Sequence, residues 1–215
     1  MRAPVRTKLL LLLFAIGLTG CFDYRERIVF KADLSGHIDI DYLVPVHPGS
    51  GRSVLAFLPI EFDRIQSRYS SLFFLERVEI QNYSVIYSMG DSLQFPLLAR
   101  VRYRLDFGTP GELERLLPGR ATVVARRRSV TIRRSFPAGR PLPENSARFP
   151  RRVLEQVRQN LEGGLMSFRV EVPEGFELST NRGTLRGAGM DFRLPLEDTL
   201  TAAEDFNWRF QLRER

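Results

Sequence analysis

Few side chains in this sequence could perform acid–base or metal chemistry, and they are widely separated. The 215 residues include two histidines, His37 and His47, and a single cysteine, Cys21. Asp39 and Asp41 lie on one face of an alternating stretch, so they could act as the paired carboxylates of a hydrolase. A solvent-exposed polar face accounts for the same two aspartates without catalysis, and it is the interpretation we favour.

Other kinds of catalytic or cofactor site are disfavoured by the residue pattern. Zinc sites need clustered Cys, His and carboxylate ligands, and no second cysteine is present to complete one. The sequence contains no Gly-x-Ser-x-Gly nucleophile motif. Gly183, Gly187 and Gly189 lie between expected strands and do not open a helix, so they indicate hairpin turns and not a phosphate-binding loop. We therefore expect no metal, no cofactor and no enzyme activity.

The densest group of charges is an arginine-rich segment in the second half of the chain. Between Arg120 and Arg158 there are eleven arginines and only two glutamates, a local charge of +9. Such a density creates a positive field that attracts anionic lipid headgroups or acidic polymers, although salt screens it beyond roughly 8 Å. The residues that we expect to bind anions are Arg126, Arg127, Arg128, Arg133, Arg134, Arg151 and Arg152.

A structural role for these arginines is the alternative. They could pair with acidic residues of the first hairpin and of the C-terminal strands, among them Glu171, Glu174, Glu177 and Glu197. Nucleic acid is not an expected partner, because the chain has no recognisable motif of that kind and begins with an export signal.

That export signal occupies the first twenty residues. Arg2, Arg6 and Lys8 form a cationic stretch, and the apolar run Leu9–Ile16 follows it. A transmembrane helix needs roughly 20 apolar residues, whereas this run ends at Gly17. Residues 1–20 are therefore expected to be a signal peptide that is removed.

The segment Leu18-Thr19-Gly20-Cys21 resembles the lipobox of bacterial lipoproteins. The resemblance implies that Cys21 takes a diacylglycerol thioether, becomes the first residue after cleavage and is acylated on its new amine, for example by palmitate. Two or three acyl chains hold a protein firmly on a bilayer. The expected location is the extracytoplasmic side of the cell membrane or outer membrane. A buried core cysteine is the alternative.

The composition of residues 21–215 indicates a single extracytoplasmic domain. Removing the leader leaves 195 residues, enough for a substantial core, and 43% of the whole sequence is hydrophobic. The leader carries three of the seven excess positive charges, so the remaining chain has a formal charge of +4. Disulfides are not expected, because lipidation uses the only thiol.

Alternating apolar and polar residues predict a domain made mainly of strands. A first hairpin joins a strand around Ile28–Phe30 to one over Ile38–Val44 through the turn Asp33-Leu34-Ser35-Gly36. Further strands are expected at residues 78–88, 97–107, 121–126, 130–136, 168–172, 190–196 and 206–212.

Two amphipathic helices are expected beside these strands. Apolar residues at three- and four-residue steps predict one helix from Phe62 to Phe73 and another from Val153 to Leu161, and Leu113–Leu117 is typical of one helical turn. The predicted fold class is therefore α+β, a mainly antiparallel sheet of about nine strands covered by the two helices on one face.

Segments near both ends of this domain resemble bacterial lipoproteins of the LppM-domain type. The resemblance lies in Cys21, Ile28-Val29-Phe30 and the 33–36 turn, and in the later segments 168–173, Thr180-Asn181 and 191–196. It implies a cell-envelope lipoprotein whose α+β domain binds a ligand or partner, without established enzyme chemistry. Many of these proteins have a C-terminal transmembrane helix, whereas a strand is expected at the end of this chain.

The leading hypothesis is therefore a membrane-anchored, non-catalytic binding module for an envelope component, a lipid or an anionic polymer. A curved sheet closed by an amphipathic helix can leave an apolar pocket, and the chain has many phenylalanines, among them Phe57, Phe62, Phe73, Phe74, Phe95, Phe168 and Phe192. The alternatives are a purely structural envelope lipoprotein with a solid core and, third, a carboxylate-based hydrolase.

Overall fold

The computed structural model describes residues 22–55, 57–69, 78–90, 97–136, 163–196, 198 and 204–215. The predicted signal peptide, Cys21, Arg151, Arg152 and the predicted helix 153–161 all lie outside the described residues. No helix within the described part of the chain is long and apolar enough to cross a membrane.

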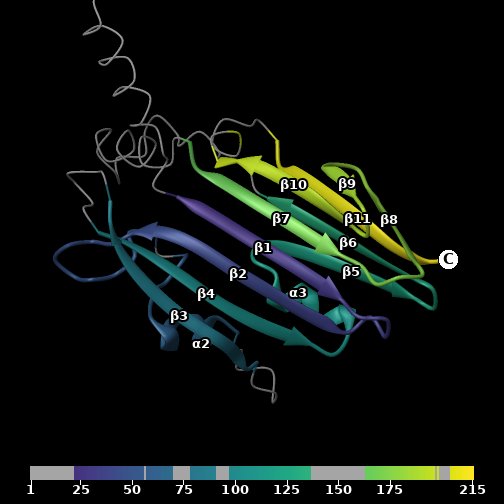
Figure 1. The fold of residues 1–215 in the computed structure, drawn as a ribbon, viewed down its shortest axis with the longest axis horizontal. Helices are drawn as coiled ribbons and strands as arrows, with labels where there is room; N and C mark the ends of the chain where they lie inside the picture. The colour runs from purple at the N-terminus through teal and green to yellow at the C-terminus, as the bar shows by residue number, and fades with distance from the viewer. Residues whose placement is uncertain are drawn as a thin grey trace, which may run out of the picture.

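A seven-stranded mixed sheet forms the larger layer of the domain (Figure 1). Its strands lie in the order β3-β4-β2-β1-β7-β10-β9, and neighbours are antiparallel except for the parallel pair β1 and β7. The bounds are β1 Asp23–Phe30, β2 Gly36–Pro45, β3 Ile80–Met89, β4 Leu97–Phe107, β7 Leu165–Glu171, β9 Thr184–Arg186 and β10 Gly189–Pro195.

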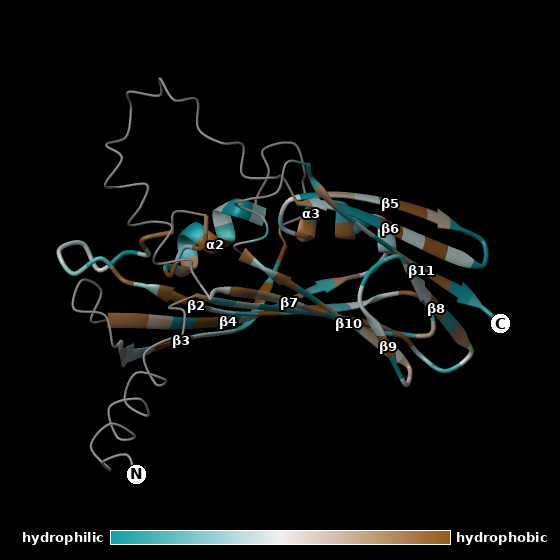
Figure 2. Cartoon of the chain, turned by 90° about the horizontal axis from the view of Figure 1, so that it is seen from above, coloured by the Kyte–Doolittle hydropathy of each residue, from teal (hydrophilic) through white to brown (hydrophobic). Residues whose placement is uncertain are grey.

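A second sheet of four antiparallel strands lies against one face of the first. Its order is β5-β6-β11-β8, with bounds β5 Arg120–Arg126, β6 Ser129–Phe136, β8 Phe176–Thr180 and β11 Phe206–Glu214. Figure 2 shows this sheet on the same side of the large sheet as the helices α2 (Phe62–Tyr69) and α3 (Leu113–Leu116), which follows the short 3-10 helix Pro110–Glu112. We call the covered side of the large sheet its inner face and the opposite side its outer face.

The core fills the space between the two layers. Strand alternation directs every second side chain inward, so Ile28 of β1, Ile38 and Ile40 of β2 and Leu105 of β4 are all buried on the inner face. Trp208 of β11 joins the sheets, because its ring centroid lies 5.4 Å from that of Phe168 and 4.9 Å from that of Phe192. Aromatic pairs at such distances stabilise a core beyond the area that they bury.

Helix α2 covers the half of the inner face that the small sheet leaves open. It buries Ile65 and Tyr69, and the Tyr69 and Tyr103 hydroxyls share a hydrogen bond of 3.0 Å. Burial raises the pKa of both phenols, so both stay protonated and can donate at neutral pH. The Tyr42 hydroxyl donates to the backbone carbonyl of Pro59 just before the helix.

The prediction of a mainly antiparallel sheet of about nine strands was only partly correct. The described residues form eleven strands in two sheets, and one pair is parallel. The first hairpin, the one helical turn near residue 113 and the amphipathic helix beginning at Phe62 are confirmed. Strands β8 and β9 were missed, because β8 is only half-buried and β9 is three exposed residues, which leaves little apolar periodicity.

Candidate ligand-binding pocket

A pocket of about 380 Å³ opens between the layers at the end of the molecule where β1 begins. Phe22 precedes β1, Met166 and Phe168 come from β7, and Leu116 belongs to α3. The other described residues of the wall are Tyr24, Phe57, Leu58, Arg68, Tyr69, Arg115, Leu117, Pro118, Gly119, Arg134 and Phe136. The volume lies within the range of small-molecule sites, roughly 300–1,000 Å³, and the lining is largely apolar, as such sites usually are.

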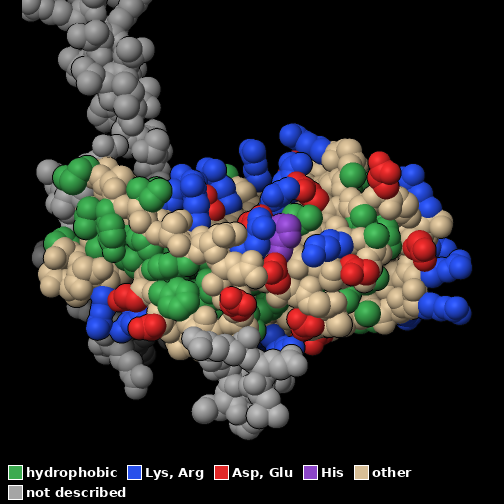
Figure 3. All heavy atoms as spheres, turned by 60° about the horizontal axis from the view of Figure 1, so that its bottom comes forward, with side chains coloured by type: hydrophobic (Ala, Val, Ile, Leu, Met, Phe, Trp, Pro, Cys, Tyr) green, Lys and Arg blue, Asp and Glu red, His purple; other side chains and the backbone are tan. Residues whose placement is uncertain are grey.

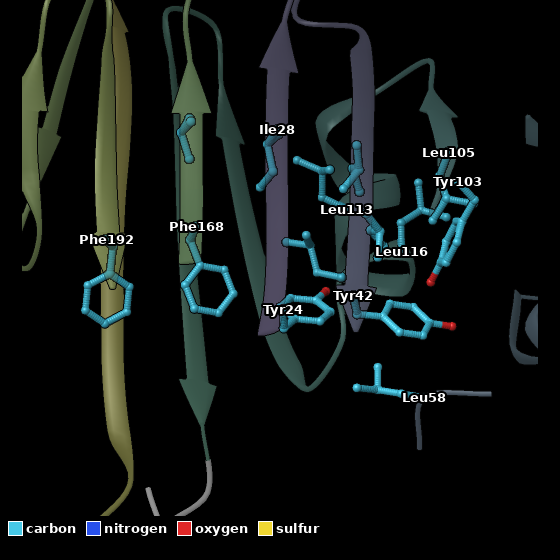
Figure 4. Close-up of a cluster of buried hydrophobic side chains, with 14 of the residues drawn as sticks. Tyr24, Ile28, Tyr42, Leu58, Tyr103, Leu105, Leu113, Leu116, Phe168 and Phe192 are labelled. Atoms are coloured by element: carbon cyan, nitrogen blue, oxygen red, sulfur yellow. The ribbon is translucent and has the colours of Figure 1, made fainter. Parts of the chain in front are cut away.

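The pocket is reached from solvent past Phe57. This side chain is 58% exposed, whereas Phe22, Leu58 and Leu116 on the same wall are buried. Figure 4 shows Tyr24 and Leu58 at the same end of the sheet, where β1 begins and β2 ends, and both line the pocket. The apolar wall is therefore continuous from the surface into the space between the layers.

A buried ion pair holds Arg134, which lines the inner end of the pocket. Glu26 points inward from β1 and Arg134 points inward from β6, and their side chains are 0% and 1% exposed. The Arg134 Nη1 atom donates to Glu26 Oε1 at 2.5 Å, and Nη2 donates to Glu26 Oε2 at 3.2 Å and to the Pro118 carbonyl at 3.0 Å. This two-pronged geometry is the strong form of the arginine–carboxylate interaction.

Aromatic rings surround the Arg134 guanidinium. Its central carbon lies 4.9 Å from the ring centroids of Phe136 and Phe168 and 5.8 Å from that of Trp208, within cation–π range. The Arg134 Nε atom has no hydrogen-bond partner among the described residues. The cation is thus held by one carboxylate, one carbonyl and three aromatic rings, and its side chain is almost completely buried.

Tyr24 completes the polar group at this end. Its hydroxyl donates to Glu26 Oε2 at 3.0 Å, and burial, reinforced by the neighbouring Glu26 charge, raises the pKa of the phenol well above its usual value. Because both Glu26 oxygens already accept hydrogen bonds, the carboxylate is committed to structure. None of the described lining residues is a carboxylate, whereas Arg68 and Arg115 contribute positive charge. The described wall of the pocket is thus mostly apolar, and its charged side chains are cationic.

The predicted anion-binding arginines do not form one surface. Arg126, Arg127, Arg128 and Arg133 are exposed on β5, β6 and the turn between them, and Arg128 lies 3.9 Å from Glu214. Arg134 is instead buried in the pocket wall, so it does not belong to an exposed surface. Arg151 and Arg152 lie outside the described residues. Anion binding by the exposed members remains a prediction.

Two of the acidic residues expected to neutralise that segment, Glu171 and Glu177, have other partners. Glu171 accepts hydrogen bonds from Arg27 Nη2 at 2.6 Å and Arg169 Nε at 2.7 Å, and the Arg27 bond is the main cause of its lowered pKa. Glu177 lies 3.7 Å from Arg215. Glu197 lies outside the described residues. Among the described arginines of the segment, Arg134 pairs with Glu26 of the first hairpin and Arg128 with Glu214 of the C-terminal strand β11, as that alternative expected.

Asp39 and Asp41 lie on the outer face of the large sheet and are occupied by arginines. Asp41 accepts from Arg100 at 2.8 Å and from Arg102 at 3.0 Å, and Asp39 accepts from Arg104 at 2.7 Å. On the side of the molecule in Figure 3, cationic and acidic side chains are interspersed in this way. These pairs support the polar-face interpretation of the two aspartates.

His37, on the same strand, has a lowered pKa caused mainly by burial. Its Nε2 atom lies 3.5 Å from the Asp39 carboxylate. No group of three or more His, Cys, Asp or Glu side chains in the described residues is arranged to hold a metal ion.

Sequence reasoning missed Glu26 and misassigned Arg134, although a signal was present. Glu26 stands between Tyr24 and Ile28 in an alternating stretch, and Arg134 occupies the corresponding place between Ile132 and Phe136. Period two places both charges on the buried faces of their strands. Two inward charges of opposite sign indicate that those strands face each other.

The search of curated proteins gives no match. Among solved structures, the chain is similar to the NMR structure of the folded domain of the Mycobacterium tuberculosis LppM protein, with 11% identity and a TM-score of 0.46, over 91% of this chain and 92% of that one. The lipobox remains a prediction. The sequence model of the LIC11874-like family matches residues 16–215. The chain therefore belongs to the LIC11874-like family.

Proposed function

We propose that this protein is a lipoprotein anchored on the extracytoplasmic side of a membrane, and that its domain is a non-catalytic module binding an acyl chain in the pocket between its sheets. The observation that carries the proposal is the apolar pocket of about 380 Å³ whose wall includes Phe22. An acyl chain suits this pocket because the lining residues are mostly apolar, and the nearby arginines favour an anionic headgroup at the entrance.

The position of Phe22 connects the pocket to the predicted anchor. Phe22 follows Cys21 directly, and consecutive Cα atoms are only about 3.8 Å apart. Lipid on Cys21 would therefore hold this end of the domain against the bilayer, where acyl chains are available. A structural lipoprotein without ligand would need neither an open apolar pocket nor its placement beside the anchor.

Native mass spectrometry of the full chain, extracted from membranes in mild detergent, tests ligand binding. Met166 lies in the pocket wall, so Met166→Trp should fill the pocket and abolish retained lipid. The matched control is Met89→Trp, because Met89 is 79% exposed on β3 and should accept the same substitution without loss of lipid. Wild-type protein without retained lipid, or equal retention in both variants, would contradict the acyl-chain proposal.

The same spectra test the anchor separately. The mature chain should begin at Cys21 and carry the mass of a diacylglyceryl group and of an amide-linked fatty acid. An unmodified Cys21 with an intact leader would refute the proposed anchor, whereas the result on lipid binding in the pocket would be unaffected.

A further inference from the structure

The outer side of the four-stranded sheet carries an unusual arrangement of arginines. Arg120, Arg126, Arg133, Arg209 and Arg213 are all exposed there, and we call this surface the basic face. Strand register places Arg133 of β6 directly opposite Arg209 of β11. Arg120 of β5 is opposite Ser135, two residues beyond Arg133 on β6, so it lies diagonally beside Arg133.

The lack of carboxylates between its opposed arginines distinguishes the basic face from the outer face of the large sheet, where Arg27 is opposite Arg169 but Glu171 accepts hydrogen bonds from both. There Asp39, Asp41 and Glu171 each hold two arginines at hydrogen-bonding or ion-pair distance. In the described part of the chain, by contrast, no ion pair joins Arg120, Arg133 or Arg209 to a carboxylate. Like charges directly opposite each other destabilise a sheet. The sequence thus neutralises one sheet surface and leaves the other cationic.

A hollow of about 460 Å³ lies among these arginines. Its exposed or half-buried lining includes Arg120, Thr122, Arg133, Ser135, Asn207 and Arg209, so guanidinium groups alternate with hydroxyl and amide groups. Two acidic groups lie at the margins of the basic face. The Ser135 hydroxyl donates to Asp205 at 3.3 Å, and Glu177 is opposite Arg213 at the far end of the face.

We propose that the basic face binds a linear anionic polymer of the cell envelope through its phosphate or carboxylate groups. Guanidinium forks match such groups in geometry and charge, and neighbouring hydroxyl and amide groups can complete their hydrogen bonds. Anion binding follows from charge complementarity and does not depend on the pocket, whereas the choice of a polymer as the ligand rests on the proposed membrane anchor.

The orientation of the basic face relative to the predicted anchor favours a polymer, and not the bilayer surface, as its ligand. Gly119 lines the pocket together with Phe22, so Arg120 lies at the predicted membrane end. From Arg120 the basic face extends along β5 to Arg126, about 20 Å away at roughly 3.3 Å per residue. Headgroups in one plane would reach only the first arginines, whereas a linear polymer can follow the whole strand.

The test uses the full chain in detergent with fluorescently labelled inorganic polyphosphate, followed by anisotropy. Arg133→Gln/Arg209→Gln should weaken binding about tenfold or more, because hydrogen bonds between charged groups are the strong ones. The control Arg186→Gln/Arg193→Gln removes two charges from β9 and β10 of the other sheet and should change binding by less than about twofold. Equal loss in both variants would mean attraction by net charge alone and would overturn the proposal.

Two further measurements decide between this role and its competitors. Tighter binding to phosphatidylglycerol vesicles than to polyphosphate would make the membrane the partner and overturn the proposal, as would the absence of polyphosphate binding. The Arg133→Gln/Arg209→Gln variant should be at least as resistant to urea as wild type, because it relieves repulsion between opposed cations. A clear loss of stability would show that the pair is structural, again against the proposal.

Discussion

Replacing Arg134 by methionine should remove a large part of the stability of this protein. The Glu26 and Arg134 side chains are 0% and 1% exposed and form an ion pair between the two sheets. The substitution therefore leaves the Glu26 carboxylate buried without a cation. Removing one partner of a buried ion pair costs about 3–5 kcal/mol, mostly for the uncompensated charge. Domains of this kind are stable by roughly 5–15 kcal/mol, so the variant should approach the limit of folding.

The chain supplies its own probe for this measurement. Trp208 is the only tryptophan, it is 1% exposed, and its ring lies 5.8 Å from the Arg134 guanidinium. Its fluorescence in a urea titration therefore reports unfolding of the interface that contains the ion pair. The midpoint should fall strongly while the slope with urea stays constant, because the surface exposed on unfolding is nearly the same.

The double variant Glu26→Gln/Arg134→Met is the control. It removes both charges and keeps a carbonyl oxygen at residue 26 to accept the Tyr24 hydroxyl. We expect it to be more stable than Arg134→Met alone by about 2 kcal/mol or more, because no unpaired charge remains buried. The role of the ion pair in stability would be refuted if Arg134→Met lowered the free energy of unfolding by less than about 1 kcal/mol, or if the double variant regained none of the lost stability.

Two further predictions concern the first hairpin and the acid response. Gly36→Ala should lower the free energy of unfolding, measured in urea, by roughly 1–3 kcal/mol, because a Cβ atom there would lie 1.9 Å from the Val29 carbonyl oxygen. The matched control is Gly111→Ala, where a Cβ atom would have no other atom within 4 Å. Equal losses of stability in the two variants would contradict the steric explanation. The hydrogen bond from Arg27 lowers the pKa of Glu171 below its ordinary 4.5. The stability from ionised Glu171 is therefore complete above pH 4.5 and is lost as the pH falls through the lower folded-state pKa. Glu171→Gln should flatten this part of the stability profile, and an NMR titration of Glu171 at its ordinary pKa would contradict the prediction.

The parts of the fold that depend on neighbouring residues could be predicted from the sequence. The turn at 33–36 and the alternation on both sides of it specify the β1–β2 hairpin, which has the register Ile28 to Ile38 and Phe30 to Gly36. The parallel pair β1–β7 could not be predicted from local patterns. It places Arg27 opposite Arg169, and no turn signal in the chain between them indicates that the two strands are neighbours. Parallel pairing depends on the crossover and on which faces are buried, and both are decided by the whole domain.

Charge density along the chain proved a poor guide to the candidate site. Arg133 and Arg134 are adjacent in the arginine-rich segment, and counting charges assigns both to one anion-binding surface. The two-residue period of β6 separates them, so that Arg133 is exposed on the basic face and Arg134 is buried in the pocket wall. Their environments could be told apart only by aligning the charges with Ile132 and Phe136 on the same strand.

The buried pair also bears on how the two sheets align. Their facing surfaces are otherwise apolar, and apolar side chains alone tolerate several arrangements of similar burial. A slip of two residues along β1 or β6 would leave both Glu26 and Arg134 buried without a partner, at a cost comparable to that of the single substitution. We infer that the ion pair selects one alignment and thereby fixes the shape of the pocket beside it. In the double variant, stability should then recover while the indole N–H of Trp208 gives more than one NMR signal; a single sharp signal would show that packing alone sets the alignment.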